Sequence, residues 1–216
     1  MIQAGARATQ EFDDVAAPLL DWLAGLLSAP MSVGAVAACR SCEGRVLFHA
    51  IGDELGCSIG IAAMCSAIDS DERDDVVATR LAGVYMRLFE GPGGPATVSL
   101  YESTYAGPTR RLNQQATATM EAMLRRCDIA VRADCGEPPD HLALEVALLS
   151  TLIRSGERVA AAEMRHRLQR WVPHPAAACA DADPTGFYRG ALAALHETLL
   201  AFDSPAAHRT RHDCST

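Results

Sequence analysis

The sequence of 216 residues contains no lysine, so all 19 of its basic residues are arginine. Against these stand 27 acidic residues, which gives a formal net charge of −8. Nucleic acids and anionic membrane surfaces bind proteins through a basic footprint, which this excess of acid opposes. The composition therefore argues against either as the main partner and favours a cationic one.

Aromatic residues are also scarce, because the chain has only 2 tryptophans, 4 tyrosines and 5 phenylalanines. Valine and isoleucine are few beside 39 alanines and 22 leucines. Alanine and leucine are strong helix formers, whereas strands favour β-branched and aromatic residues. A chain of this length buries about 70% of the surface that it exposes when unfolded, so it needs no disulfide or metal to hold a core. We expect an all-α fold in a single domain.

The chain lacks an uninterrupted hydrophobic run long enough to span a membrane. Its first apolar run, Leu19–Leu27, is broken by Asp21, and the charged residues before it are acidic apart from Arg7. A secretory signal needs a basic start and a continuous apolar stretch, and a spanning helix needs about 20 apolar residues. We therefore expect a cytoplasmic protein that does not insert stably into membranes and whose eight cysteines stay reduced.

Apolar residues recur at helical spacing along most of the chain. The expected helical regions are 9–27, two or three short helices within 32–70, 71–90, 112–131, the stretch between Asp140 and Ser155, 157–171 and 184–202. Two Gly/Pro-rich breaks, Gly91–Pro95 and Gly136–Asp140, interrupt this pattern. We expect one helical bundle over residues 1–203 with a hinge near 134–140, followed by a disordered tail over 204–216.

Two short motifs suggest chemistry but lack the surroundings that it requires. Gly56–Gly60 matches the Gly-x-Ser-x-Gly pattern of serine hydrolases with Ser58 as nucleophile, but no β-rich segment precedes it. Cys39 and Cys42 have the spacing of half a zinc site, and no second Cys/His pair lies nearby in the sequence. We expect no catalytic residue and no metal site; a small hydrolase using Ser58 is the alternative from a different functional class.

Three segments carry the most specific pattern. Tyr85–Gly93 reads YMRLFEGPG, Ser99–Tyr105 reads SLYESTY, and Glu137–Glu145 reads EPPDHLALE. In this order and spacing they resemble the TorD/DmsD family of cytoplasmic chaperones for molybdenum-containing oxidoreductases. That family pairs an aromatic-x-x-Leu-Phe-x-Gly-Pro run with a Tyr-Glu-Ser-x-Tyr segment and a Pro-Asp-His-Leu-x-x-Glu helix start. The resemblance extends to elements near both ends and so covers nearly the whole chain.

The resemblance implies an all-helical, non-enzymatic chaperone that binds the twin-arginine signal peptide, and often the body, of an apo-molybdoenzyme of the TMAO/DMSO reductase type. Such a chaperone holds the precursor until the molybdenum cofactor is inserted and prevents premature export. The twin-arginine translocase and cofactor-biosynthesis proteins are further partners that it implies. A nitrate-reductase-type assembly chaperone of the same superfamily is the alternative. The resemblance also implies a monomer or a domain-swapped homodimer with no bound cofactor and at most weak GTP binding.

Carried over residue by residue, the motifs of the family imply a recognition region. It would include Tyr85, Leu88, Phe89, Gly91, Pro92, Tyr101, Ser103, Tyr105, Pro139, Asp140, His141 and Leu142.

The residues themselves favour the same kind of partner. A twin-arginine signal offers two adjacent guanidiniums followed by an apolar segment, so its receptor should combine carboxylates with an apolar groove. Glu90 and Glu102 flank the first break, and Glu137 and Asp140 flank the second. We therefore add Glu137 to the predicted recognition region.

The same side chains also have purely structural interpretations. Leu88, Phe89 and Leu142 lie on apolar helical stripes and can belong to the core. Asp140 is a plausible N-cap of the helix that follows it. His141 and Glu145 are four residues apart, so we expect them to form a side-chain pair that orients the hinge.

Overall fold

The computed structural model describes residues 2–91, 94, 96–106, 115–132 and 135–203, without the side chains of residues 2–8. These residues form ten α-helices and one short 3₁₀ helix, and they contain no β-strand. In chain order the elements are α1 (Ile2–Ser28), α2 (Val33–Arg40), α3 (Cys42–Leu55), α4 (Ser58–Ile68), α5 (Asp74–Phe89), η1 (Glu102–Thr104), α6 (Gln115–Arg126), α7 (Leu142–Arg154), α8 (Arg158–Trp171), α9 (Pro173–Ala182) and α10 (Phe187–Ala201). The predicted all-α bundle is therefore confirmed for the part of the chain that is described.

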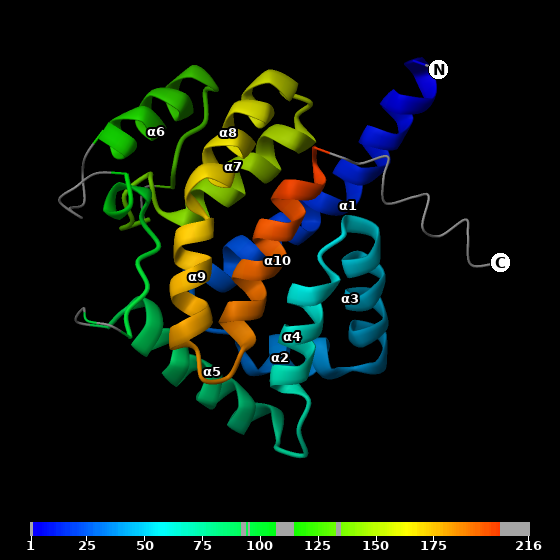
Figure 1. Cartoon of the computed structure of the whole chain (residues 1–216), viewed down its shortest axis with the longest axis vertical. Helices are drawn as coiled ribbons and strands as arrows, with labels where there is room; N and C mark the ends of the chain where they lie inside the picture. The colour runs from blue at the N-terminus through cyan, green and yellow to red at the C-terminus, as the bar shows by residue number, and fades with distance from the viewer. Residues whose placement is uncertain (1, 92–93, 95, 107–114, 133–134, 204–216) are drawn as a thin grey trace.

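One continuous hydrophobic core runs through the bundle. Figure 1 shows α10 in its middle, between α9 and α4, and α10 packs most extensively against α4. Helix α1 packs most extensively against α7, where the hydroxyl of Ser150 donates a hydrogen bond to the carbonyl of Ala17 (2.9 Å). Leu20, Leu23 and Leu27 of α1 are fully buried, as their helical spacing predicts.

The contact between α4 and α10 depends on two glycines. A Cβ atom on Gly60 would lie 2.3 Å from the backbone nitrogen of Ala194, and one on Gly190 would lie 2.7 Å from the carbonyl oxygen of Gly60. Such distances are far below van der Waals contact, so only glycine lets the two backbones approach this closely. This crossing places α10 where its aromatic N-terminal residues meet α5, and the hydroxyl of Tyr188 donates to the carbonyl of Leu81 (3.2 Å).

Several predicted boundaries shift in the structure. Region 32–70 forms three short helices, as predicted. Helix α9 is not predicted by the sequence, because its segment has no apolar stripe and carries prolines at 173 and 175 in its first turn. Helix α5 begins only at Asp74, three residues after the predicted start. Helix α6 ends at Arg126, five residues before the predicted end.

Three of the predicted features fall on residues that are not described. They are Leu112 at the predicted start of the helix before the second break, Asp134 in the predicted hinge, and the tail over 204–216. None of the described helices is both long enough and apolar enough to cross a membrane.

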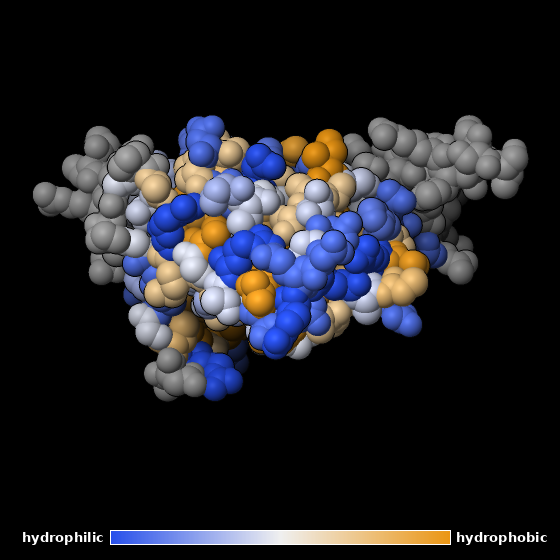
Figure 2. Space-filling model, turned by 90° about the horizontal axis from the view of Figure 1, so that it is seen from below, coloured by the Kyte–Doolittle hydropathy of each residue, from blue (hydrophilic) through white to orange (hydrophobic). Residues whose placement is uncertain are grey.

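The acidic residues around the start of α5 are largely paired with arginines. Arg40 contacts Asp74 (2.5 Å), and Arg80 contacts Glu72 (3.1 Å). Figure 2, which views the molecule from below, shows a cluster of hydrophilic side chains in the middle of this end. Because most of its carboxylates already have a guanidinium partner, this end of the molecule offers a cationic ligand little unpaired negative charge.

Candidate functional site

The segment between the two Gly/Pro-rich breaks joins the end of α5 to the start of α7. The amide of Val98 donates to the carbonyl of Leu88 at the end of α5 (2.7 Å). A few residues later, Tyr101 and His141 form an isolated antiparallel bridge. The three motif segments therefore meet in one place, and η1 lies directly after the bridge.

Asp140 holds η1 against α6. Its side chain is fully buried and accepts hydrogen bonds from the amide of Ser103 (3.0 Å) and from the hydroxyl of Thr117 on α6 (2.8 Å). Both carboxylate oxygens are thus satisfied inside the protein. The interpretation of Asp140 as the N-cap of α7 is wrong, because its side chain points to η1 and α6 instead.

The N-cap of α7 is His141. Its Nδ1 accepts a hydrogen bond from the amide of Ala143 (3.2 Å), so this nitrogen carries no proton. The imidazole lies edge-on to the ring of Tyr101, with 5.0 Å between centroids. Burial lowers the pKa of His141, and the carboxylates of Glu137 and Asp140 only partly oppose this.

The expected pair between His141 and Glu145 does not form. Glu145 points instead to α8, where Arg167 Nε donates to its Oε1 (3.2 Å) and the indole of Trp171 donates to its Oε2 (2.9 Å). The guanidinium of Arg167 also contacts Glu102 on η1 and donates to the carbonyl of Ala116 on α6 (2.8 Å). These contacts form a buried charged cluster of Glu102, Glu145 and Arg167.

The cluster holds two carboxyl groups and one guanidinium. Burial raises the pKa of Glu145 to about 8, with Arg167 opposing the rise and Glu102 adding to it. Burial also raises the pKa of Glu102, while Arg167 opposes this. Two buried carboxylates beside one guanidinium would leave one negative charge unpaired, so burial favours a proton on one of them. The physical arrangement is therefore one protonated and one ionised carboxyl around Arg167.

Arg167 is a site residue that the sequence reasoning missed. A usable signal was present, since Met164, Arg167, Leu168 and Trp171 share one face of the predicted helix 157–171. The other three are apolar or aromatic, and a cation on such a face must find a buried carboxylate. The position of that carboxylate, on η1 and α7, depends on the tertiary fold.

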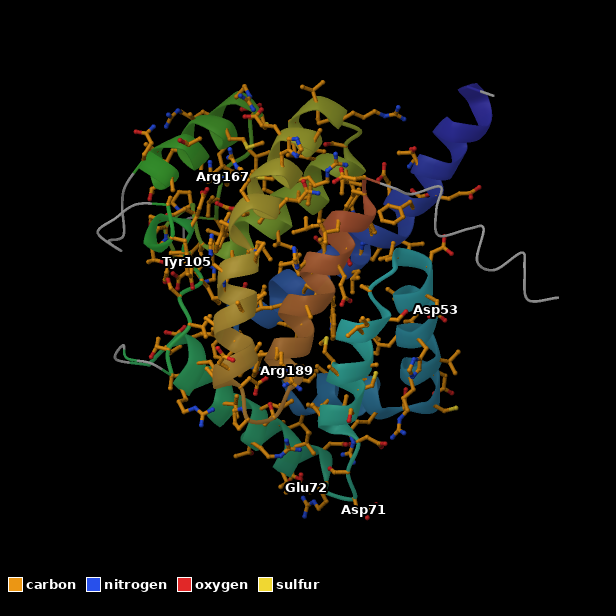
Figure 3. All side chains as sticks on the ribbon, viewed as in Figure 1. Asp53, Asp71, Glu72, Tyr105, Arg167 and Arg189 are labelled. Carbon is orange, nitrogen blue, oxygen red and sulfur yellow. The ribbon has the colours of Figure 1, made fainter. Side chains whose placement is uncertain are left out.

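Tyr105, just after η1, lies on an aromatic stack. Its ring stacks on His174 of α9 with 5.6 Å between centroids and an angle of 9°, and on Trp171 at 6.0 Å. Its hydroxyl donates to the carbonyl of Ser99 (3.0 Å). In Figure 3, Tyr105 and Arg167 lie on the same side of the bundle, far from the acidic end at Asp71 and Glu72.

The last residues of α5 pack in the core next to the site. Tyr85 and Leu88 are buried, and the hydroxyl of Tyr85 donates to the carbonyl of Leu27 (3.2 Å). Phe89 is half-buried and packs edge-on to Tyr85 and to Tyr188, with centroids 5.2 and 5.4 Å apart. The interpretation of Leu88 as a core residue is confirmed, and Phe89 lies at the border between core and surface.

Two exposed carboxylates lie beside Tyr101. The tyrosine hydroxyl donates to Glu137 (2.6 Å), and burial together with the carboxylates of Glu137 and Glu90 raises the pKa of Tyr101. The same two carboxylates contribute to a raised pKa of Tyr85. Glu90 follows α5 and Glu137 precedes α7, so residues almost fifty positions apart place their negative charge around one ring.

The thirteen predicted recognition residues divide by exposure. Buried are Tyr85, Leu88, Ser103, Asp140, His141 and Leu142; half-buried are Phe89, Gly91, Tyr101, Tyr105 and Pro139; Glu137 is exposed; Pro92 lies outside the described residues. The structure therefore brings the described members together as a buried support beneath a smaller accessible surface. We call the accessible part, with Glu90 added, the Tyr101 surface: Phe89, Glu90, Tyr101, Tyr105 and Glu137.

Ser58 does not lie in a nucleophile elbow. It is the first residue of α4 and follows α3 through Gly56, whose φ of 66° ends that helix in the left-handed region. Its hydroxyl donates to Asp53 (2.9 Å). An elbow requires a strand before the serine, and the described elements on both sides of Ser58 are helices.

Comparison with known proteins places the chain among chaperones. A family model described as nitrate reductase delta subunit matches residues 56–176. Chaperone protein TorD of Aeromonas salmonicida is 30% identical over 200 residues, which cover 87% of this chain and 89% of that protein. Chaperone protein TorD of Vibrio atlanticus is 26% identical over 206 residues, covering 90% of this chain and 94% of the relative.

Proposed function

Because the chain belongs to the TorD/DmsD family of molybdoenzyme maturation chaperones, which are not enzymes, we propose that its Tyr101 surface binds the twin-arginine signal peptide of an apo-molybdoenzyme precursor. In this proposal the protein acts in the cytoplasm and also holds the body of the client, a TMAO/DMSO reductase-like enzyme. Binding would keep the precursor from export until the molybdenum cofactor has been inserted.

The observation that carries this proposal is the pair of exposed carboxylates around Tyr101. Of the four acidic residues that flank the two breaks, Glu102 and Asp140 are buried and already bound within the protein. Glu90 and Glu137 are exposed, and both act on the same tyrosine. Guanidinium groups form bidentate pairs with carboxylates, so two adjacent arginines find two acceptors here.

The apolar part of a signal peptide also finds a partner on this surface. Phe89, Tyr101 and Tyr105 are half-buried aromatic rings whose backs pack against the protein. Rings held in this way offer large contact area at little entropic cost. Burying apolar area contributes about 25 cal/mol per Å², so the apolar segment supplies most of the affinity and the arginines supply orientation.

Calorimetry with a twin-arginine signal peptide tests the proposal. We expect the wild type to bind and the double variant Glu90→Gln/Glu137→Gln to bind about 3- to 30-fold more weakly, since each removes one exposed charge pair. Glu43→Gln/Glu54→Gln on α3 is the matched control, because it removes the same charge on the opposite side of the bundle (Figure 1). No binding by the wild type, or equal loss in both double variants, would contradict the proposal.

The nitrate-reductase-type branch is a second candidate, favoured by the description of the matching family model. The two branches differ in client and not in fold. Calorimetry with N-terminal peptides from a nitrate reductase and from a TMAO/DMSO reductase-like enzyme separates them, and we expect the second peptide to bind more tightly.

Other partners and states of the proposal can be measured directly. The twin-arginine translocase and cofactor-biosynthesis proteins are further proposed partners, to be tested by co-purification with the client. Sedimentation should show a monomer or a domain-swapped homodimer. We also propose at most weak GTP binding, so that millimolar GTP should shift the unfolding temperature only slightly.

A further inference from the structure

Arg167 connects more elements of the site than any motif residue does. Its guanidinium is buried, with 7% of the residue exposed, and it reaches from α8 to Glu145 on α7, to Glu102 on η1 and to the carbonyl of Ala116 on α6. The planar guanidinium has five donors in a fixed fork, so it can hold several acceptors in one geometry. The three acceptors come from three different elements, η1, α6 and α7.

The cluster lies directly beneath the two tyrosines of the Tyr101 surface. Glu102 is the residue after Tyr101, and η1 ends one residue before Tyr105. Trp171, which donates to Glu145, also stacks against the ring of Tyr105. Arg167 therefore fixes Tyr101 through Glu102 and Tyr105 through Glu145 and Trp171, although it does not reach the surface itself.

The charge of the cluster depends on one proton. Glu102 and Glu145 are buried beside a single guanidinium, and burial raises the pKa of Glu145 to about 8. Asp140, before α7, is the other carboxylate that acts on Glu102. Helix α6 contributes the Ala116 carbonyl and the Thr117 hydroxyl.

Helix α9 brings one titratable group near the site, His174, which stacks on Tyr105. Helix α1, on the other side of α7, contributes the Ala17 carbonyl that accepts from Ser150. Its Asp21 pairs with Arg154 at the far end of α7. Loss of the shared proton would leave Glu102 and Glu145 both ionised beside one cation, Arg167, with the carboxylate of Asp140 nearby. Repulsion between these carboxylates would push Glu102, and η1 with it, away from Arg167.

We infer that Arg167 is a positioning residue of the peptide-binding surface, and that with a proton shared by Glu102 and Glu145 it holds η1 in the geometry that the peptide requires. This inference rests on the proposed function. Arg167 acts through Glu102, Glu145 and Trp171 and makes no contact with the peptide. Peptide affinity should accordingly fall as the pH rises and the shared proton leaves.

Two variants and a matched control test the inference. Arg167→Met removes the cation and should weaken binding of an N-acetylated twin-arginine peptide at least tenfold. Glu145→Gln removes the titrating carboxyl and keeps one amide oxygen, which accepts from one of the two donors, Arg167 Nε or the Trp171 indole. The affinity that this variant has at pH 7 should stay unchanged to pH 9, whereas the wild type weakens severalfold over the same range. Arg165→Met, which removes a nearby arginine of α8 that pairs with Asp203, should leave peptide affinity unchanged.

A second readout does not depend on the peptide. In a Trp22→Phe background, Trp171 is the only tryptophan, and its fluorescence should change between pH 7 and 9 in the wild-type cluster and stay constant with Glu145→Gln. If the wild type binds no peptide, the proposed function fails, and this titration still decides whether the cluster is proton-dependent.

The inference is overturned by any of three results: wild-type affinity in folded Arg167→Met, a pH dependence that survives Glu145→Gln, or a Trp171 signal that does not change with pH. If Arg167→Met does not fold, the pH profile of Glu145→Gln alone decides.

Discussion

At the scale of single residues, the cap of α7 requires His141 to be neutral. Its Nδ1 caps α7, and its ring is buried against Tyr101. A proton on Nδ1 would remove the acceptor and place positive charge at a helix N-terminus, where the helix dipole opposes it. Protonation of His141 at low pH should thus weaken the cap of α7. The cluster of Glu102, Glu145 and Arg167 should instead change when it loses a proton at high pH.

The free energy of unfolding should therefore fall on acidification through this residue. The pKa of His141 in the folded protein lies below its ordinary value of 6.5. As the pH drops below 6.5, the unfolded chain therefore binds a proton on His141 more readily than the folded chain does. The stabilisation from neutral His141 is thus fully present above pH 6.5 and is lost as the pH falls below that value.

His141→Asn keeps a capping acceptor without the titration, so it should unfold with a flatter pH dependence between pH 5 and 7 in urea titrations. His196, whose pKa is also lowered by burial, is present in both proteins and cancels in the difference. Parallel pH profiles for the two proteins would contradict this role of His141.

At the scale of elements, the crossing of α4 and α10 sets the bundle's geometry. Gly60 and Gly190 face each other there, and neither position has room for a methyl group. The crossing in turn fixes where Tyr188 meets Tyr85 and Phe89, which support the Tyr101 surface.

Gly60→Ala should lower the free energy of unfolding by about 1–3 kcal/mol, because overpacking forces two backbones apart. Gly83→Ala is the matched control, since nothing lies within 4 Å of a Cβ at this exposed position of α5. Alanine is the better helix former, so Gly83→Ala should stabilise by about 0.5–1 kcal/mol. Chemical denaturation of both variants measures the difference, and a neutral or stabilising Gly60→Ala would show that the crossing tolerates a larger separation.

The elements that the sequence predicts well are those whose own periodicity carries the information. The stripes of α1, α7, α8 and α10 are visible in the sequence, and the three motifs locate the site. Helix α9 lacks such a stripe, and the direction of a single side chain is a tertiary property: Asp140 turns to η1 and α6, and Glu145 to Arg167. The motifs therefore indicate which segments meet, and the location of the recognition region stays a prediction, whereas the predicted roles of these two acids are wrong.

At the scale of the whole molecule, the net charge of −8 acts through its distribution. Acidic residues at the start of α5 have arginine partners, and Glu102, Glu145 and Asp140 are satisfied in the interior. Glu90 and Glu137 remain exposed around Tyr101, where the two breaks meet. Two of the exposed carboxylates are thus available to a cationic partner beside half-buried aromatic rings.

The pairing of charges also predicts how binding responds to salt. Exposed ion pairs are screened at high ionic strength, whereas apolar contacts are not. Peptide affinity should fall severalfold between 50 mM and 500 mM NaCl in the wild type and change much less in Glu90→Gln/Glu137→Gln, as measured by calorimetry. An equal salt dependence in both proteins would mean that the arginines bind elsewhere.

Hydrogen exchange with and without a twin-arginine signal peptide tests whether the peptide binds at the Tyr101 surface, because it locates the bound peptide without any mutation. Bound peptide should slow exchange in the described amides of residues 86–91, 98–106 and 135–143, while α3 and α4 should exchange as in the free protein. Protection confined to other elements would contradict binding at the Tyr101 surface. An example is protection only of the parts of α1, α7 and α8 that line a cavity of about 200 Å³.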